Sequence, residues 1–230
     1  MSKEHRVRIV ADHDPMDPRG WENASRMICW HPRRNLGDDH NYDCDDFLRQ
    51  LTFEADADLV DRVDELETEV WEWLYDKAIA DGRQDPFEYA NQVVHTRVDE
   101  LIKKAVRTGY VILPLYLYDH SGITMSTGPF GCIFDSGQVG WIVCDNETIK
   151  REWDGDRELA EEYLRSQVEV YDDYLTGNVY GFVVEEWDGE GWECVDSCFG
   201  FYGHDIRTNG MADHLDDELI DLAEAADIEY

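Results

Sequence analysis

Lysine is scarce in this chain of 230 residues, which has five lysines beside 15 arginines. Its 20 basic side chains face 53 aspartates and glutamates, so the formal net charge at pH 7 is −33. Carboxyl groups titrate near about pH 4, so nearly all of them are ionised in neutral solution. A surface of this charge repels nucleic acids and anionic membranes and attracts basic protein surfaces, so we expect no direct binding to nucleic acid or membrane.

The sequence also lacks long apolar runs and paired cysteines. No stretch of about 18 apolar residues occurs, and the N-terminus has no apolar signal-peptide region, so we expect a cytoplasmic protein without a transmembrane helix. None of the six cysteines forms a CxxC pair, and only Cys194 and Cys198 are close in sequence. Structural zinc usually needs two close ligand pairs, so reduced and mostly buried thiols are expected, with no metal or cofactor.

Enough apolar residues are present to build a core. Hydrophobic residues make up 43% of the chain, which argues against general disorder despite the charge. Alternation and short apolar runs predict strands, two of which are expected to pair with each other at 6–11 and 27–31. Pro114 favours an edge or a bulge in its strand. The other expected strands cover 110–118, 123–126, 139–144, 179–187 and 192–198, with a glycine-rich loop over 127–138. The last two strands are expected to form a hairpin around the turn residues 188–191.

Helices are predicted from apolar residues that recur every three or four positions. Leu59, Val63, Leu66, Val70 and Trp73 are expected on the inner face of a helix over 57–77, and Asp45 or Asp46 could cap an earlier one. Further helices are expected over 86–107, 146–153, 156–175 and 211–226. Their expected inner faces are Ala90, Val94, Val98, Leu101 and Ala105 in the first, Leu159, Tyr163, Leu164, Val168, Tyr171 and Leu175 in the third, and Leu215, Leu219, Leu222 and Ala226 in the last.

Strands and helices do not alternate regularly along the chain. This order predicts an α+β fold with a mixed, mainly antiparallel sheet and amphipathic helices packed on it. We expect a single domain over 1–230, with a conceivable subdivision into 1–109 and 110–230.

The negative charge is concentrated in the last third of the chain. Residues 145–230 carry 26 acids and five bases, a net charge of −21, whereas residues 1–50 carry −2. Two predicted helices account for much of this excess, and their carboxylates could imitate an array of phosphates. The predicted partner-binding residues, called the acidic surface below, are Glu158, Glu161, Glu162, Glu169, Asp172, Asp173, Asp213, Asp216, Asp217, Asp221 and Glu224.

Several segments resemble an uncharacterised family of accessory proteins from bacteriophages, plasmids and other mobile elements. They are WENASRMICWHPRRNLGD (21–38), LPLYLYDHSGITMSTGPF (113–130), DSGQVGWI (135–142), YLTGNVYGF (174–182) and FGFYG (199–203). The resemblance implies a small accessory protein of a mobile element and supplies no activity.

Two catalytic arrangements are weaker alternatives. Asp119, His120 and Ser121, or Asp135 and Ser136, could form a Ser/His/Asp set with His31 or His204, but no GxSxG motif occurs. Turn chemistry explains the Asp-His-Ser-Gly sequence equally well.

Acidic and histidine-rich loops could instead gather a divalent metal for a hydrolase or nuclease, although no ligand pair has helix-fixed spacing. The candidate ligands are Asp12, His13, Asp14, His31, His40, Asp43 and Asp45.

Three hypotheses follow from these patterns. The preferred one is a non-enzymatic DNA mimic that inhibits a host DNA-binding defence enzyme with a basic groove, of the antirestriction or anti-CRISPR class. The second is a salt-adapted accessory protein, because few lysines and many aspartates are typical of halophilic hosts. The third is the metal-dependent hydrolase.

Overall fold

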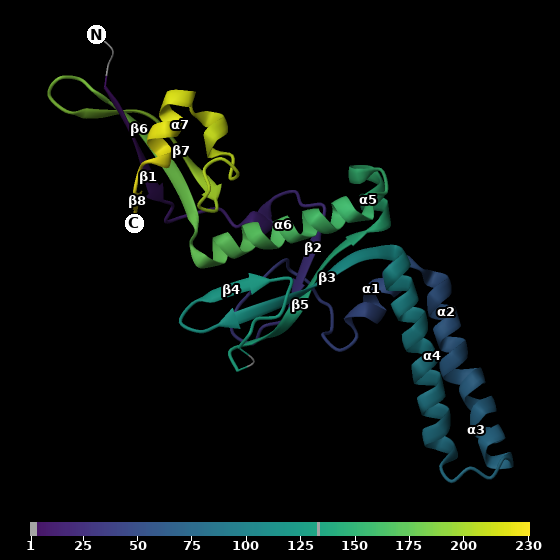
Figure 1. The fold of residues 1–230 in the computed structure, drawn as a ribbon. Helices are drawn as coiled ribbons and strands as arrows, with labels where there is room; N and C mark the ends of the chain where they lie inside the picture. The colour runs from purple at the N-terminus through teal and green to yellow at the C-terminus, as the bar shows by residue number, and fades with distance from the viewer. Residues whose placement is uncertain (1–3, 133) are drawn as a thin grey trace. The chain divides into compact units, whose positions relative to one another are not determined.

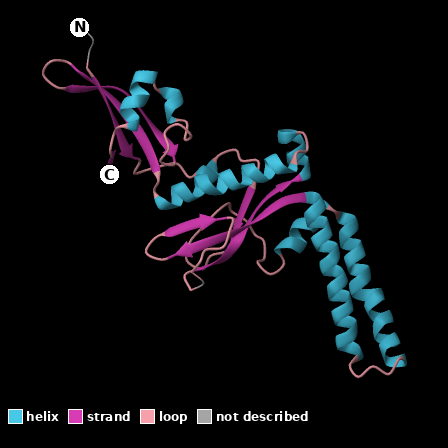
Figure 2. Cartoon of the chain, in the orientation of Figure 1, coloured by secondary structure: helices cyan, strands magenta, loops and turns pink. Residues whose placement is uncertain are grey.

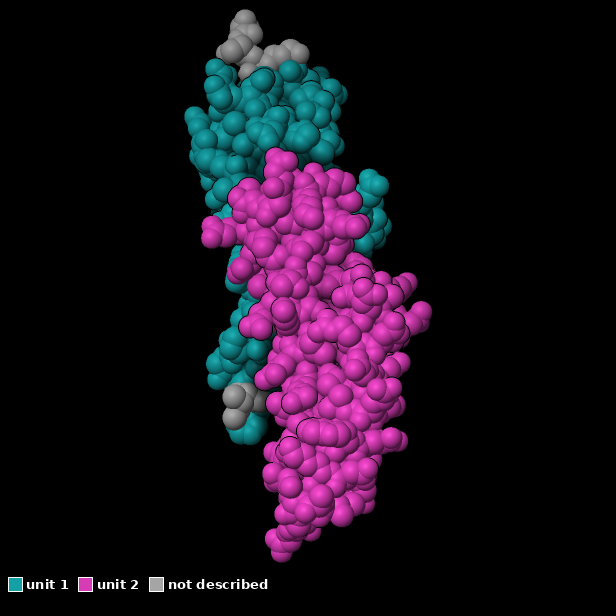
Figure 3. Space-filling view, turned by 90° about the vertical axis from the view of Figure 1, so that its right-hand side faces the viewer, with its two compact units in different colours: residues 1–23, 114–140, 162–230 teal, residues 24–113, 141–161 magenta. Residues whose placement is uncertain are grey.

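The computed structural model describes residues 4–132 and 134–230, so Ile133 in the expected 127–138 loop lies outside the described residues. The chain adopts an α+β fold with two mostly antiparallel sheets, which confirms the predicted class (Figure 2). It divides into two compact units, each built from distant stretches of sequence (Figure 3). Unit 1 comprises 1–23, 114–140 and 162–230, and unit 2 comprises 24–113 and 141–161.

The first sheet belongs to unit 1 and has the strand order β7-β6-β1-β8 (Figure 1). Strand β1 pairs with β6 in antiparallel and with β8 in parallel orientation. Val7, Ile9 and Ala11 are buried on one face of β1, as their alternation predicts. The predicted hairpin is confirmed, since β6 and β7 pair in antiparallel orientation on either side of residues 188–191. The bounds are β1 His5–Ala11, β6 Val179–Trp187, β7 Trp192–Tyr202 and β8 Ile228–Glu229.

The predicted C-terminal helix over 211–226 is wrong in one respect, because the structure divides it in two. A 3-10 turn, Met211–His214, is followed by extended backbone at Leu215 and Asp216, and α7 then runs over Asp217–Glu224. Aspartate favours the N-cap position, and the backbone carbonyl of Asp216 accepts the first helical hydrogen bonds of α7. The division turns Met211 and Ala223 toward the β1–β6 core and leaves Leu222 exposed.

Helix α6, Arg157–Thr176, contributes residues to both units. Leu164, Val168 and Tyr171 are buried as predicted, but Leu159 is 47% exposed and its neighbour Ala160 is buried instead. Within unit 1, the C-terminal half of α6 contacts the hairpin formed by β3 and β4 through side-chain hydrogen bonds. These strands are β3 Tyr110–Asp119 and β4 Ile123–Ser126.

The second sheet has the order β2-β5-β3-β4, with β2 at Arg26–Cys29 and β5 at Ser136–Asp145. The expected pairing of β2 with β1 is therefore wrong. Strand β6 pairs along one whole edge of β1, and β8 pairs with Ile9 and Val10 on the other edge, so neither edge is fully open to β2. Pro114 precedes the residues of β3 that pair with β4, so it does not interrupt that ladder.

Unit 2 contains a long helical hairpin, visible as α2–α3 against α4 (Figure 1). The predicted 57–77 helix is interrupted by a π-turn at Leu66–Val70. A π-turn holds about one residue more than an α-turn and so rotates the following face by about 100°. For this reason Trp73, predicted to face inward, is 58% exposed, while Leu74 is only 3% exposed. The helices are α1 Phe47–Ala55, α2 Ala57–Glu65, α3 Trp71–Ala80 and α4 Pro86–Gly109.

Helix termini follow ordinary capping chemistry. Asp85 accepts a hydrogen bond from Glu88 N at the start of α4, and Asp56 does the same for Leu59 N at the start of α2. Asp46 occupies the N-cap of α1 as predicted, but its side chain makes no capping hydrogen bond. No helix in the described ranges is long and apolar enough to span a bilayer.

Candidate functional site

The α6 part of the acidic surface divides into exposed and half-buried carboxylates. Glu158, Glu162 and Glu169 are exposed, whereas Glu161, Asp172 and Asp173 are half-buried. An α-helix rises 1.5 Å per residue, which places positions 158 and 162 about 6 Å apart along the axis. The exposed glutamates are therefore the carboxylates that this helix presents to solvent.

Asp172 has a structural contact that its sequence position does not reveal. Its Oδ1 accepts hydrogen bonds from Thr124 Oγ1 at 2.8 Å and from Met125 N at 2.6 Å. The carboxylate thus links α6 to β4 and is already hydrogen-bonded to two donors within unit 1. Charge-assisted bonds of this kind are roughly twice as strong as neutral ones.

Asp173 is half-buried within unit 1. Burial raises its pKa, and the neighbouring Asp172 and Glu169 carboxylates add to the rise, while a hydrogen bond from Asn178 opposes it. A Cβ on Gly203 would lie 3.2 Å from Asp173 Oδ2, so the two segments are closely packed here. Asp173 is therefore less available to an external partner than the exposed glutamates of α6.

The C-terminal part of the acidic surface is more open. Asp213, Asp216, Asp217 and Asp221 are exposed. Glu224 is also exposed, but it accepts a hydrogen bond from Arg207 Nε, which lowers the pKa of the glutamate. Four of these five carboxylates are thus left to face solvent.

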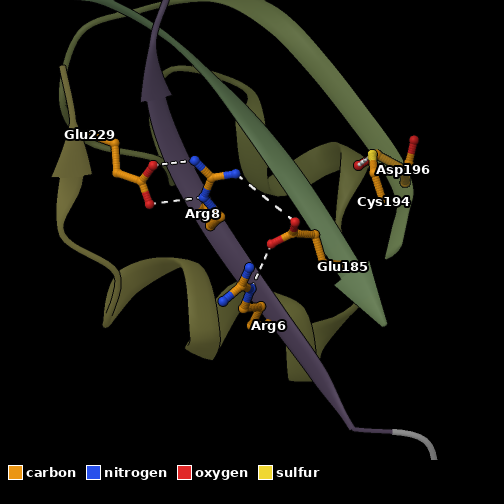
Figure 4. Close-up of polar contacts among 6 residues, drawn as sticks. All are labelled: Arg6, Arg8, Glu185, Cys194, Asp196 and Glu229. Atoms are coloured by element: carbon orange, nitrogen blue, oxygen red, sulfur yellow. Dashed lines mark hydrogen bonds and ion pairs between the residues drawn. The ribbon is translucent and has the colours of Figure 1, made fainter. Parts of the chain in front are cut away.

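A chain of ion pairs lies on the first sheet, on the opposite face from Val7 and Ile9 (Figure 4). Glu185 is 8% exposed; it accepts a hydrogen bond from Arg6 Nε at 2.6 Å and lies 4.0 Å from Arg8. Arg8 also forms a bidentate ion pair with Glu229 of β8: its Nε donates to Oε1 at 2.9 Å, and its Nη2 donates to Oε2. This pairing lowers the pKa of Glu229. The network fastens β8 and β6 to β1.

Sequence reasoning missed this network, although β1 carried a signal for it. Arg6 and Arg8 alternate with Val7 and Ile9, so the two arginines had to share the face opposite the core. Their acidic partners could not be found in the same way, because strand order decides which of the 53 acids lie beside β1.

Unit 1 carries most of the negative charge. It has 26 acidic and six basic side chains, a net charge of −20, whereas unit 2 has 27 and 14, a net charge of −13. Every arginine of unit 1 hydrogen-bonds to another side chain of that unit, and three of them bond to a glutamate. The exposed carboxylates therefore outnumber the arginines that could neutralise them.

The Ser/His/Asp hypothesis finds little geometric support. His120 Nδ1 lies 3.5 Å from Asp135 Oδ2, but the hydroxyl of Ser121 donates to the backbone oxygen of its neighbour His120. The Ser136 hydroxyl donates to the Cys132 carbonyl. Both serine hydroxyls therefore donate to backbone carbonyls, and neither is activated by an imidazole base.

The other two histidines of that hypothesis serve local contacts. His31 Nδ1 accepts a hydrogen bond from Arg33 N at 3.4 Å. His204 Nδ1 lies 2.9 Å from the hydroxyl of Tyr180, whose pKa is raised to about 12, mainly by burial.

The metal hypothesis likewise finds no assembled site. Among the residues that the structure describes, no group of three or more His, Cys, Asp or Glu side chains could hold a metal ion. His40 contacts Cys29 O at 2.9 Å and accepts from Tyr42 N, so both its ring nitrogens have backbone partners. Asp12 and Asp43 each accept from the amide two residues ahead, the geometry of polar turns. His13, Asp14 and Asp45 are exposed in the same loops.

All six cysteines are free thiols: Cys29 and Cys144 are buried, Cys132 and Cys198 are half-buried, and Cys44 and Cys194 are exposed. Burial raises the pKa of Cys144 to about 11, which keeps that thiol protonated at neutral pH. Cys194 is exposed on β7 and its Sγ lies 3.6 Å from Asp196 O (Figure 4). The prediction that most thiols are buried is wrong, since only Cys29 and Cys144 are buried.

No protein family, curated protein or solved structure compared with this chain matches it. The resemblance to accessory proteins of mobile elements stays a prediction.

Proposed function

We propose that this protein is a non-enzymatic DNA mimic from a mobile element that inhibits a host DNA-binding defence enzyme of the restriction or CRISPR type. The observation that carries the proposal is the uncompensated charge of unit 1, a net −20 in which the arginines are already engaged inside the unit. Exposed carboxylates on α6 and on 213–221, all of them in unit 1 except Glu158, would occupy the basic groove that the enzyme uses for DNA.

The physical basis of such inhibition is electrostatic. Duplex DNA presents one charge per roughly 1.7 Å of axis, and its binding proteins gain much of their affinity from that charge. A protein with exposed carboxylates competes for the same arginines and lysines and is steered toward them over about a Debye length. It needs neither a catalytic group nor a cofactor.

The proposal is tested with a charge-neutral variant of the exposed carboxylates. The six changes are Glu158→Gln, Glu162→Gln, Glu169→Gln, Asp213→Asn, Asp217→Asn and Asp221→Asn. The control removes six exposed acids from α2, α3 and the turn between them: Asp58→Asn, Asp61→Asn, Asp64→Asn, Glu69→Gln, Glu72→Gln and Asp76→Asn.

Inhibition of DNA cleavage by purified restriction and CRISPR nucleases is the readout. The wild type and the control variant should inhibit at least one enzyme, and added duplex DNA should compete with them for that enzyme. The variant of the acidic surface should inhibit it at least about tenfold more weakly. Equal inhibition by the two folded variants would show that the acidic surface is not the contact.

A second candidate function is that of a salt-adapted accessory protein. Unit 2 is also acidic, with a net charge of −13, so the excess is not confined to one unit, and the chain has only five lysines. Like carboxylates repel most when screening is weak, so this candidate predicts a protein that folds only at high salt. The thermal midpoint from about 0.1 M to above 1 M KCl decides between the two: a fold that is stable at low salt favours the DNA mimic.

A further inference from the structure

A hollow in unit 2 combines an apolar floor with a basic rim. Its volume is about 590 Å³, which falls within the range of pockets that hold small organic ligands. It lies where the C-terminal end of α4 meets α1, β3 and β5. The lining residues are Leu48, Glu100, Lys103, Lys104, Val106, Arg107, Ile112 and Trp141.

The floor is held in place by the core of unit 2. Leu48 and Ile112 pack against both buried clusters of this unit, and Trp141 packs against the cluster around Phe47 and Val143. Leu48, Ile112 and Trp141 nevertheless stay only half-buried. The apolar surface of the hollow is therefore preformed and open to solvent, so a ligand would gain by covering it.

The rim is basic in a chain that is otherwise strongly acidic. Residues 97–107 carry four bases and two acids, a net charge of +2 within a chain of −33. Lys103 lies 3.9 Å from Asp99 on the same helix. Across the described residues, neither Lys104 nor Arg107 has an acidic partner, so two cationic groups at the rim are available.

The usual reason for bases at this position does not account for them. Cations stabilise the last turn of a helix because the carbonyl groups there lack partners. Arg157 already fills that role for α4: its guanidinium donates to the carbonyls of Arg107 and Tyr110 and to Asn146 Oδ1. Lys104 and Arg107 are additional to this cap.

We propose that the hollow binds a small amphipathic organic anion. Its apolar body would lie on Trp141, Ile112 and Leu48, and its carboxylate, sulfonate or phosphate head would bond to Lys104 and Arg107. A polyanion such as nucleic acid does not fit, because beyond the rim it would meet a chain of net charge −33. None of the lining residues belongs to the acidic surface, and this site does not depend on the proposed function.

The test measures binding of two anions and their neutral amides to the full-length protein by calorimetry: indole-3-acetate against indole-3-acetamide, and octanoate against octanamide. The double variant Lys104→Gln/Arg107→Gln removes the two available cations. Lys150→Gln/Arg151→Gln makes the same charge change at two exposed positions of α5, Asn146–Trp153, away from the hollow lining. Circular dichroism confirms that each variant is folded.

The wild type and the control variant should bind at least one of the two anions. The Lys104/Arg107 variant should bind that anion about tenfold more weakly, and the wild type should bind the matching amide about tenfold more weakly, because each change removes a charge-assisted hydrogen bond. Trp141→Leu should weaken binding of the indole more than that of octanoate. The proposal is overturned if neither anion binds, if anion and amide bind equally, or if both double variants lose affinity alike. Sedimentation of the wild type and of Trp141→Leu tests self-association: a wild-type dimer that this variant dissociates would mean that a second copy of the chain covers the hollow, and would also overturn the proposal.

Discussion

Replacing Glu185 with glutamine tests whether the ion-pair network on the first sheet stabilises unit 1. The carboxylate is 8% exposed and contacts Arg6 at 2.6 Å and Arg8 at 4.0 Å. Glutamine keeps the size and one acceptor oxygen but removes the charge, and its amide group would face a guanidinium. Breaking a buried pair costs about 3–5 kcal/mol, but the two arginine side chains are 45% and 36% exposed and can be rehydrated. We therefore expect a loss of about 1–2 kcal/mol.

Urea unfolding followed by tryptophan fluorescence measures this loss, and a double-mutant cycle with Arg6→Gln isolates the pair. Arg6 also lies 4.6 Å from the ring centroid of Trp192, so its single variant loses a cation–π contact that the cycle subtracts. Glu193→Gln on β7 is the matched control, because this glutamate is exposed, and it should change stability by less than about 0.5 kcal/mol. A coupling energy near zero, or equal losses for Glu185 and Glu193, would refute the reasoning.

Three further predictions follow from burial and from the shifted pKa values. Leu74→Ala should lower the free energy of unfolding by about 2–5 kcal/mol, and Trp73→Ala should lower it much less, because only Leu74 is buried. Losses in urea unfolding that do not differ in this way would contradict the π-turn that turns Leu74 inward. Asp173→Asn should stabilise the protein at pH 7. The raised pKa of Asp173 means that the folded protein loses stability as the pH rises and this carboxyl ionises, and asparagine cannot ionise. The gain should vanish in urea unfolding curves below about pH 4, where the carboxyl is protonated in both states. Tyr180, with a pKa of about 12, should make stability fall as pH rises above about 10, and Tyr180→Phe should flatten that part of the pH profile.

Local patterns predicted most elements, because burial of one face leaves a period in the sequence. The alternation of Val7, Ile9 and Ala11 gave β1, and the spacing of Ala90, Val94 and Val98 gave the inner face of α4. The β6–β7 hairpin followed from its turn residues in the same way.

The errors arose where a distant part of the chain decides the outcome. The partner of β2 depends on β8, which occupies the second edge of β1 from more than 200 residues away. The single residue added by the π-turn puts Leu74 instead of Trp73 in the buried position, and the amino-acid composition of the helix gives no sign of this. The sequence could place acids on α6, but the inward orientation of Asp172 depends on where β4 lies.

The parallel pairing of β1 with β8 has a consequence for the order of folding. Ile9 pairs with Ile228 and Val10 with Glu229, so β1 leaves the ribosome long before the distant segment that completes its sheet. Contacts of such sequence separation are slow to form, whereas α3 and α4 are adjacent in sequence and pack against each other. During synthesis, helices of unit 2 can therefore form while β1 is still an unpaired strand, exposed to chaperones and to wrong partners.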